Sequence, residues 1–138
     1  MRKEELLTLL KEQKEHEELE IETYARKVRE TDHSVAKLLY AKLMRDSIHH
    51  AEVLNSVITY LAKSEWESHP LKESREELLR LMELEEQALR LFTNASNQVN
   101  DPHLKTLFTM LALDEEQHYA MLRYVLENFV HKEEKIAA

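Results

Sequence analysis

The chain has 138 residues, a formal net charge of −8, two prolines and neither cysteine nor glycine. This length predicts a single domain, and the lack of glycine favours an all-α fold because the turns of a β-sheet protein depend on that residue. The acidic balance argues against nucleic acid and an anionic membrane as partners. The lack of cysteine excludes disulfides, thiolate metal sites and catalytic thiols. Because there is no long apolar run and no signal peptide, we expect a cytoplasmic protein.

The first two helices are predicted over residues 3–29 and 34–62, from apolar residues spaced three and four apart. The turn between them is short, so the two helices should be antiparallel. The inward seam of the first helix contains Leu6, Leu10, Glu17, Glu20, Ile21, Tyr24 and Val28. The inward seam of the second contains Val35, Leu39, Leu43, Asp46, Ser47, His50, Val53, Val57 and Leu61. Each seam is therefore apolar at its ends and polar in the middle.

Residues 64–73 are the one irregular stretch, and they hold Trp66 and Leu71, which we expect to lie against the helices. A third helix is predicted from a capping box that begins at Ser74. It ends before Pro102, a residue that suits the first turn of a fourth helix, predicted to extend to residue 131. The third seam contains Leu78, Leu81, Glu85, Ala88, Phe92 and Val99, and the fourth contains Leu104, Leu107, Leu111, Glu115, His118, Leu122, Val125 and Phe129.

The most informative pair is Glu115 and His118 on the fourth helix. Residues three apart share one face of a helix, so the carboxylate and the imidazole should point the same way. The apolar neighbours predict that this face lies inside the fold. Burying these two groups is unfavourable unless they are paired, hydrogen-bonded or bound to a metal.

An internal repeat relates the two halves of the chain at an offset of 68 residues. The segment LMRDSIHHAEVL aligns with LALDEEQHYAML, which matches His50 with His118. The same offset places Glu17 on Glu85. We therefore expect two helical hairpins of one design, each giving a Glu from its first helix and a His from its second.

With these residues, the chain resembles the ferritin-like superfamily of di-iron carboxylate proteins, and within it the rubrerythrin type. The resemblance implies a four-helix bundle with a crossover from the second helix to the third, over residues 64–73. Carried over residue by residue, its metal ligands are Glu17, His50, Glu85, Glu115 and His118. Where the family has a further Glu on the second helix, this chain has Ser47. Either Asp46 or Glu20 is a candidate to replace that carboxylate, and Asp46 also has ligand spacing with His49.

The resemblance implies two bound metal ions, with iron expected and manganese or zinc as alternatives. It also implies an oxidoreductase that reduces peroxide or O₂, or oxidises Fe(II). The family's four-cysteine electron-donor domain has no counterpart in this chain, so a separate donor protein is expected, and we also expect a homodimer. The alternative is a single-metal or metal-free bundle with a structural or partner-binding role.

Overall fold

The structure is a computed structural model in which residues 1–66 and 71–130 are described. Its four helices are α1 (Lys3–Glu30), α2 (Ser34–Lys63), α3 (Arg75–Gln98) and α4 (Pro102–Phe129). The described residues include no β-strand, which confirms the predicted all-α class. None of the helices, as far as they are described, is long and apolar enough to cross a membrane.

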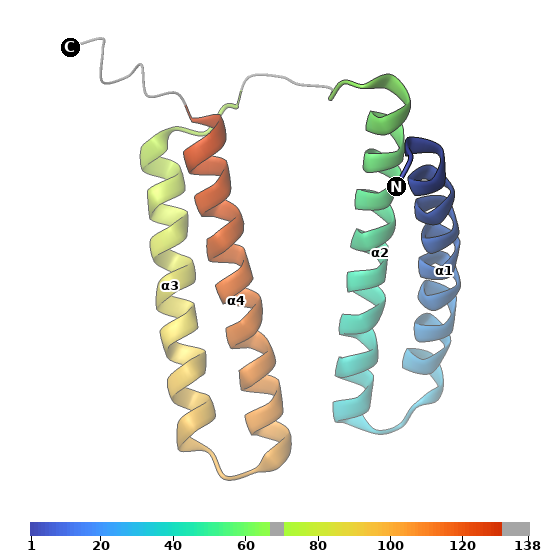
Figure 1. Ribbon diagram of the computed structural model, residues 1–138. Helices are drawn as coiled ribbons and strands as arrows, with labels where there is room; N and C mark the ends of the chain where they lie inside the picture. Colours follow the sequence, from blue (N-terminus) through green and yellow to red (C-terminus); the bar gives the residue numbers. More distant parts are fainter. Residues whose placement is uncertain (67–70, 131–138) are drawn as a thin grey trace, which may run out of the picture. The chain divides into compact units, whose positions relative to one another are not determined.

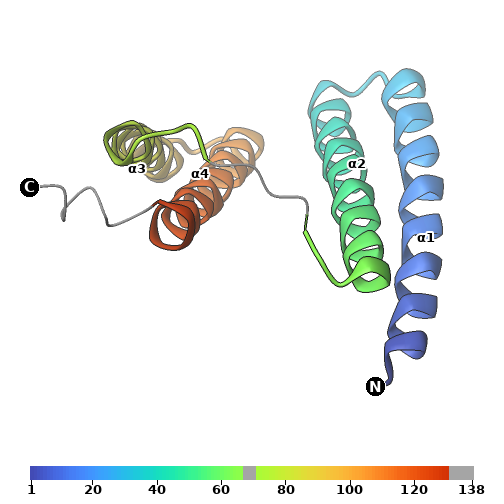
Figure 2. The same cartoon turned by 90° about the horizontal axis from the view of Figure 1, so that it is seen from above.

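The helices form two antiparallel hairpins, α1–α2 and α3–α4 (Figure 1). The two hairpins belong to separate compact units, and each is described by itself. Viewed from above, α1 lies beside α2 and α3 lies beside α4 (Figure 2). This division agrees with the internal repeat, because each hairpin corresponds to one copy.

Local capping explains why α2, α3 and α4 begin where they do. Ser74 accepts a hydrogen bond from the backbone N–H of Glu77 at 3.1 Å, as the capping box predicted. Asp101 accepts backbone hydrogen bonds from the first turn of α4, in which Pro102 occupies the expected position. The helix α2 begins at Ser34, with the ring of His33 as its cap. The helix α4 ends at Phe129, two residues before the predicted end, because the backbone of Val130 is extended. Residues 67–70 of the predicted crossover lie outside the described residues.

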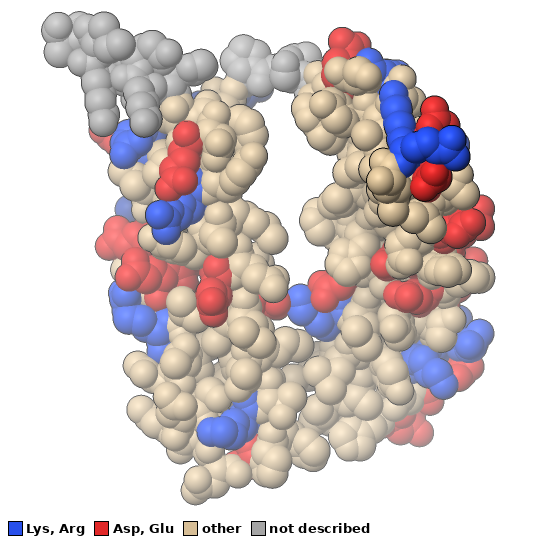
Figure 3. Space-filling model, in the orientation of Figure 1, with Lys and Arg blue, Asp and Glu red and all other residues tan. Residues whose placement is uncertain are grey.

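The two hairpins differ in what they bury. In α3–α4 the buried core is apolar and consists of Leu78, Met82 and Leu126, and the polar Ser96 is buried beside α4, where its hydroxyl shares a hydrogen bond with Thr109. In α1–α2 the buried side chains are polar: Glu17 is 7% exposed and Ser47 is 4% exposed. Charged side chains gather along α1, while the visible side of α2 is largely uncharged (Figure 3).

Several residues predicted to face inward are exposed within their hairpins. They are Leu43 at 42%, Val53 at 45%, Leu81 at 42%, Leu104 at 46% and Phe129 at 53%. A hairpin covers one stripe of each helix, and these side chains lie outside that stripe. Trp66 is also exposed, at 57%, and its ring stacks on Tyr60 of α2 at a centroid distance of 4.2 Å.

Candidate metal centre

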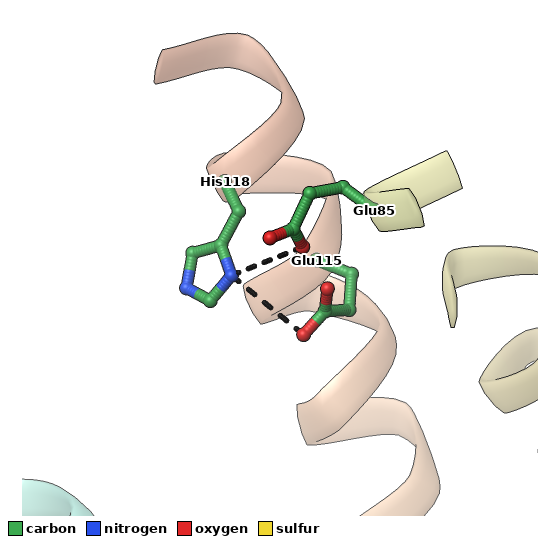
Figure 4. Close-up of side chains that lie close together, drawn as sticks. All are labelled: Glu85, Glu115 and His118. Carbon is green, nitrogen blue, oxygen red and sulfur yellow. Dashed lines mark hydrogen bonds and ion pairs between the residues drawn. The ribbon is translucent and has the colours of Figure 1, made fainter. Parts of the chain in front are cut away.

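Glu85, Glu115 and His118 form one cluster in the hairpin α3–α4 (Figure 4). The Nδ1 atom of His118 lies 3.3 Å from Oε2 of Glu85 and 3.6 Å from Oε1 of Glu115. Glu85 comes from α3, and the other two residues are one helical turn apart on α4. Among the residues that the structure describes, this is the one group of three or more His, Asp and Glu side chains whose ligand atoms all lie within 4.8 Å of one another.

The two carboxylates of this cluster repel each other when both are charged. The pKa of Glu115 is raised above its ordinary value of 4.5, first because its carboxyl group shares a hydrogen bond with Glu85. Burial and the negative charge of Glu85 raise it further, while the neighbouring His118 lowers it. A divalent cation between the two carboxylates would remove this repulsion.

The hairpin α1–α2 repeats the contact between Glu and His. The Nδ1 atom of His50 lies 3.4 Å from Oε1 of Glu17, which corresponds to the 3.3 Å contact between His118 and Glu85. The side-chain amide of Gln13 donates a hydrogen bond to the same Glu17 oxygen at 3.2 Å. The other oxygen, Oε2 of Glu17, is buried and has no hydrogen-bond partner. A buried carboxylate oxygen without a partner is unfavourable, and a cation is one group that satisfies it.

The remaining predicted ligands separate into two kinds. Glu20 faces the seam of α1–α2, where its Oε2 accepts a hydrogen bond from the hydroxyl of the buried Ser47 at 3.2 Å. Asp46 was predicted to face the core, but its side chain is 45% exposed and pairs along α2 with Lys42 at 3.0 Å. His49 is also directed along the surface of α2, 3.8 Å from Glu52.

The imidazoles are less buried than the sequence predicted. The side chain of His118 is 49% exposed and that of His50 is 59% exposed, whereas Glu17 and Glu115 are at 9% and 17%. Each hairpin therefore covers its carboxylates and leaves its imidazole at the edge of the seam.

The distances suit a shared cation. Two atoms bound to one metal at about 2.1 Å are roughly 3.0 Å apart at a right angle and roughly 3.4 Å apart at a tetrahedral angle. The contacts of 3.3 Å in α3–α4 and 3.4 Å in α1–α2 are close to these values. A donor set of carboxylate oxygen and imidazole nitrogen, without sulfur, suits iron, manganese and zinc.

Two residues of α1–α2 make hydrogen bonds that the sequence did not reveal. No role was predicted for Gln13, although its spacing of four from Glu17 is that of a helical side-chain pair. Ser47 was noted as a departure from the family pattern, whereas it is a hydrogen-bond donor to Glu20. The contact between Ser47 and Glu20 could have been inferred, because the sequence places these two residues on the facing seams of α1 and α2.

In comparisons with known proteins, no family model, no curated protein and no solved structure matches the chain. Any assignment of function therefore rests on the side chains of the two hairpins.

Proposed function

We propose that this chain is a di-metal carboxylate protein of the ferritin-like, rubrerythrin type that acts as an oxidoreductase on peroxide, O₂ or Fe(II). The observation that carries the proposal is the repeated contact between a Glu and a His. It occurs at 3.4 Å between Glu17 and His50 and at 3.3 Å between Glu85 and His118. Two unrelated surface ion pairs have no reason to recur at equivalent positions of two hairpins with the same partners.

The proposal requires the two hairpins to pack as a four-helix bundle around their polar centres. The exposed apolar side chains support this packing, because burial of such surface stabilises a fold by about 25 cal/mol per Å². Leu43 and Val53 offer that surface on α2, and Leu81 and Leu104 offer it on α3 and α4.

The proposed bundle includes a crossover between α2 and α3. Residues 64–74 connect Lys63 to Arg75, and a segment of this length spans roughly 36–40 Å when it is extended. The helix α3 has 24 residues and is therefore about 36 Å long. The connection is long enough to run the length of the bundle if it is nearly straight.

Glu17 and His50 from one hairpin, with Glu85, Glu115 and His118 from the other, would hold the two metals. Iron is the metal we propose, with manganese and zinc as the alternatives for this donor set. A pair of ferrous ions would supply the two electrons that reduce peroxide or O₂. The carboxylates would neutralise the charge of the cations, and Gln13 would keep the Glu17 carboxylate in place through its hydrogen bond. We further propose that a separate donor protein returns the electrons and that the protein is a homodimer.

The proposal is tested on untagged protein, since a polyhistidine tag binds the same metals. The chain is stripped with a chelator and dialysed anaerobically against Fe(II), and iron per chain is measured by mass spectrometry. We expect two ions in the wild type and fewer in the variants Glu17→Ala and Glu85→Ala. The variant Glu22→Ala, an exposed change on α1, is the matched control. Hydrogen peroxide consumption by the loaded protein is then measured against the stripped protein. A wild type that takes up no stoichiometric iron, manganese or zinc would refute the proposed function.

A further inference from the structure

One side of α4 faces away from His118 and carries exposed apolar side chains. Leu113 and Tyr124 lie on it and are 55% and 60% exposed. They are 11 residues apart in the sequence, which places them within about 20° of one line along the helix and about 16 Å apart. Both lie about 120° or more around the helix axis from His118. The packing proposed around the polar centres uses the His118 side and therefore leaves this side uncovered.

A hollow of about 280 Å³ opens between α3 and α4 beside Leu113. Thr93 and Asn97 line it from α3, and Ala112 and Leu113 line it from α4. A cavity of about 150 Å³ is large enough to bind benzene, so this hollow has room for an aromatic side chain. Its apolar wall suits the ring of a tyrosine, and the hydroxyl of Thr93 and the amide of Asn97 suit the phenol hydroxyl.

Tyr124 has the shape and the chemistry to fill such a hollow. Its ring is 60% exposed, yet it is held edge-to-face against Phe129 at a centroid distance of 5.8 Å. An exposed tyrosine in a fixed orientation is typical of an anchor at a protein–protein interface. The hollow beside Leu113 is about 16 Å away along the same helix, which is too far for the Tyr124 ring of the same chain. A second copy of the chain presents an identical ring that is free of this restriction.

One two-fold axis serves both copies at once. In an antiparallel pair of α4 helices, residues at equal distances on either side of the axis face each other. The midpoint of Leu113 and Tyr124 falls between residues 118 and 119, and that of Glu116 and Arg123 falls between residues 119 and 120. An axis near residue 119 therefore brings each Tyr124 to the hollow of the other copy and each Arg123 to a carboxylate of opposite charge.

This second pair orients the two copies. The guanidinium of Arg123 donates a hydrogen bond through Nε to Glu127 of its own helix at 2.8 Å, and its remaining N–H groups can bind a second carboxylate. An exposed ion pair adds little stability. Complementary charges do suppress other registers, such as the parallel one, in which Arg123 would face Arg123.

The internal repeat shows that this surface belongs to α4 alone. Its three central positions have polar counterparts on α2: Leu113 corresponds to Arg45, Ala120 to Glu52 and Tyr124 to Ser56. If packing within the chain required apolar residues on this side, both helices would carry them. At the position next to the axis, α4 has the small side chain of Ala120, which allows close approach of two helices. On α2, Glu52 would meet its own negative charge there.

We propose that two copies of this chain associate through α3–α4, with the two α4 helices antiparallel and each Tyr124 in the hollow of the other copy. This inference gives the surface of the proposed homodimer and rests on that part of the proposed function alone, because it requires no metal. A contact made mainly by one helix of each copy is smaller than the 1,200–2,000 Å² or so of a permanent interface. We therefore expect a dimer that dissociates on dilution.

Sedimentation equilibrium of untagged, full-length protein, stripped of metal with a chelator, gives the dissociation constant of this dimer. Tyr124→Ala should raise that constant at least about tenfold, because it removes the anchor from both halves of the contact. Leu19→Ala is the matched control, since Leu19 is an apolar residue of α1 that is 62% exposed, and its removal should leave the constant unchanged. Circular dichroism checks that both variants are helical.

A cross-link reports on the position of the axis, because the chain has no cysteine of its own. In Ala120→Cys, the thiols of the two copies should lie close together, and the thiol oxidant diamide should convert most of the protein into a disulfide-linked dimer on a non-reducing gel. Glu52→Cys places a thiol at the repeat counterpart on α2, where the side chain is 70% exposed, and it should remain largely monomeric. Adding Tyr124→Ala to Ala120→Cys should slow the cross-linking about tenfold.

Three results would overturn this inference: a wild type that sediments as a monomer at every concentration, a dissociation constant that Tyr124→Ala leaves unchanged, or equal cross-linking at positions 120 and 52. None of them bears on the uptake of iron by the same protein, which tests the metal centre separately. A protein that takes up no metal but dimerises through Tyr124 would refute the proposed metal chemistry and leave this surface in place.

Discussion

Replacing Glu115 with glutamine should stabilise the metal-free protein and destabilise the metal-loaded one. In the metal-free protein, the carboxyl groups of Glu115 and Glu85 lie close together. Their hydrogen bond, with burial and the charge of Glu85, raises the pKa of Glu115. Glutamine has nearly the same shape as the protonated acid and carries no charge. Its amide can donate a hydrogen bond to Glu85 at every pH.

The expected stabilisation of the metal-free protein by Glu115→Gln follows from the distance between the two carboxylates. Their ligand oxygens lie within 4.8 Å of each other. Two unit charges at that distance repel by about 0.9 kcal/mol in water and by about 3.5 kcal/mol at an effective dielectric constant of 20. Both side chains retain some exposure and His118 offsets part of the repulsion, so we take a net gain of about 1 kcal/mol for Glu115→Gln at pH 7. This gain corresponds to a rise in Tm of about 3–6 °C for a chain of this size.

The direction of the pKa shift of Glu115 determines how its contribution to stability depends on pH. The pKa of Glu115 is higher in the folded state than its ordinary value, so its contribution to stability is fully present below about pH 4.5 and is lost as pH rises through the raised folded value. Glutamine does not titrate. The advantage of Glu115→Gln should therefore be small at acid pH and should grow as the pH rises toward neutrality.

Thermal denaturation followed by circular dichroism, with and without Mn(II), checks both effects. A cation at 100 times its Kd stabilises the folded protein by about 2.7 kcal/mol, and Glu115→Gln should lose much of this because it removes a ligand. Glu115→Gln should therefore be more stable than the wild type without metal and less stable than the wild type with Mn(II). Glu116→Gln, the adjacent exposed change, should show neither effect. A Glu115→Gln protein that is less stable than the wild type without metal at pH 7 would refute the reasoning.

Three further changes test the fold and the site. Leu78→Ala should lower the free energy of unfolding by about 2–4 kcal/mol in urea titrations, because Leu78 is 3% exposed. Its neighbour Leu79, at 44% exposure, is the control, and an equal loss at both positions would contradict the assigned core. Ser74→Ala should cost about 1 kcal/mol through the lost cap, and an unchanged urea midpoint would show that the cap contributes nothing. His118→Ala should weaken the binding of Zn(II) by more than about tenfold in calorimetric titrations, whereas the exposed His16→Ala should not.

The helix boundaries could be predicted because their determinants are local. Ser74 and Asp101 cap their helices through side-chain bonds within three residues, and such spacings are visible in the sequence. The pairing of Glu17 with His50 and of Glu85 with His118 could be predicted because seam positions and the repeat define them jointly.

The exposure of the seam residues could not be predicted in the same way. An apolar stripe on a helix can be about 100° wide, and the sequence does not tell which part of it a hairpin partner covers. Leu43 and Val53 belong to the predicted seam of α2, yet α1 leaves them more than two-fifths exposed. The width of the stripe also explains why Asp46 and Ser47 were both placed on the seam, whereas the structure separates an exposed carboxylate from a buried hydroxyl.

The polar centre of α1–α2 has a consequence for how the two hairpins depend on a cation. In α3–α4, the apolar side chains of Leu78, Met82 and Leu126 form a buried core apart from the Glu and His cluster. In the described part of α1–α2, the buried side chains are Glu17 and Ser47, and Oε2 of Glu17 has no hydrogen-bond partner. A cation would convert that unfavourable centre into a set of ligand bonds, while in α3–α4 it would add to a core that already exists. The folding of α1–α2 should therefore gain more from metal binding than the folding of α3–α4, because Glu17 is both a buried residue of this hairpin and a ligand of the proposed site.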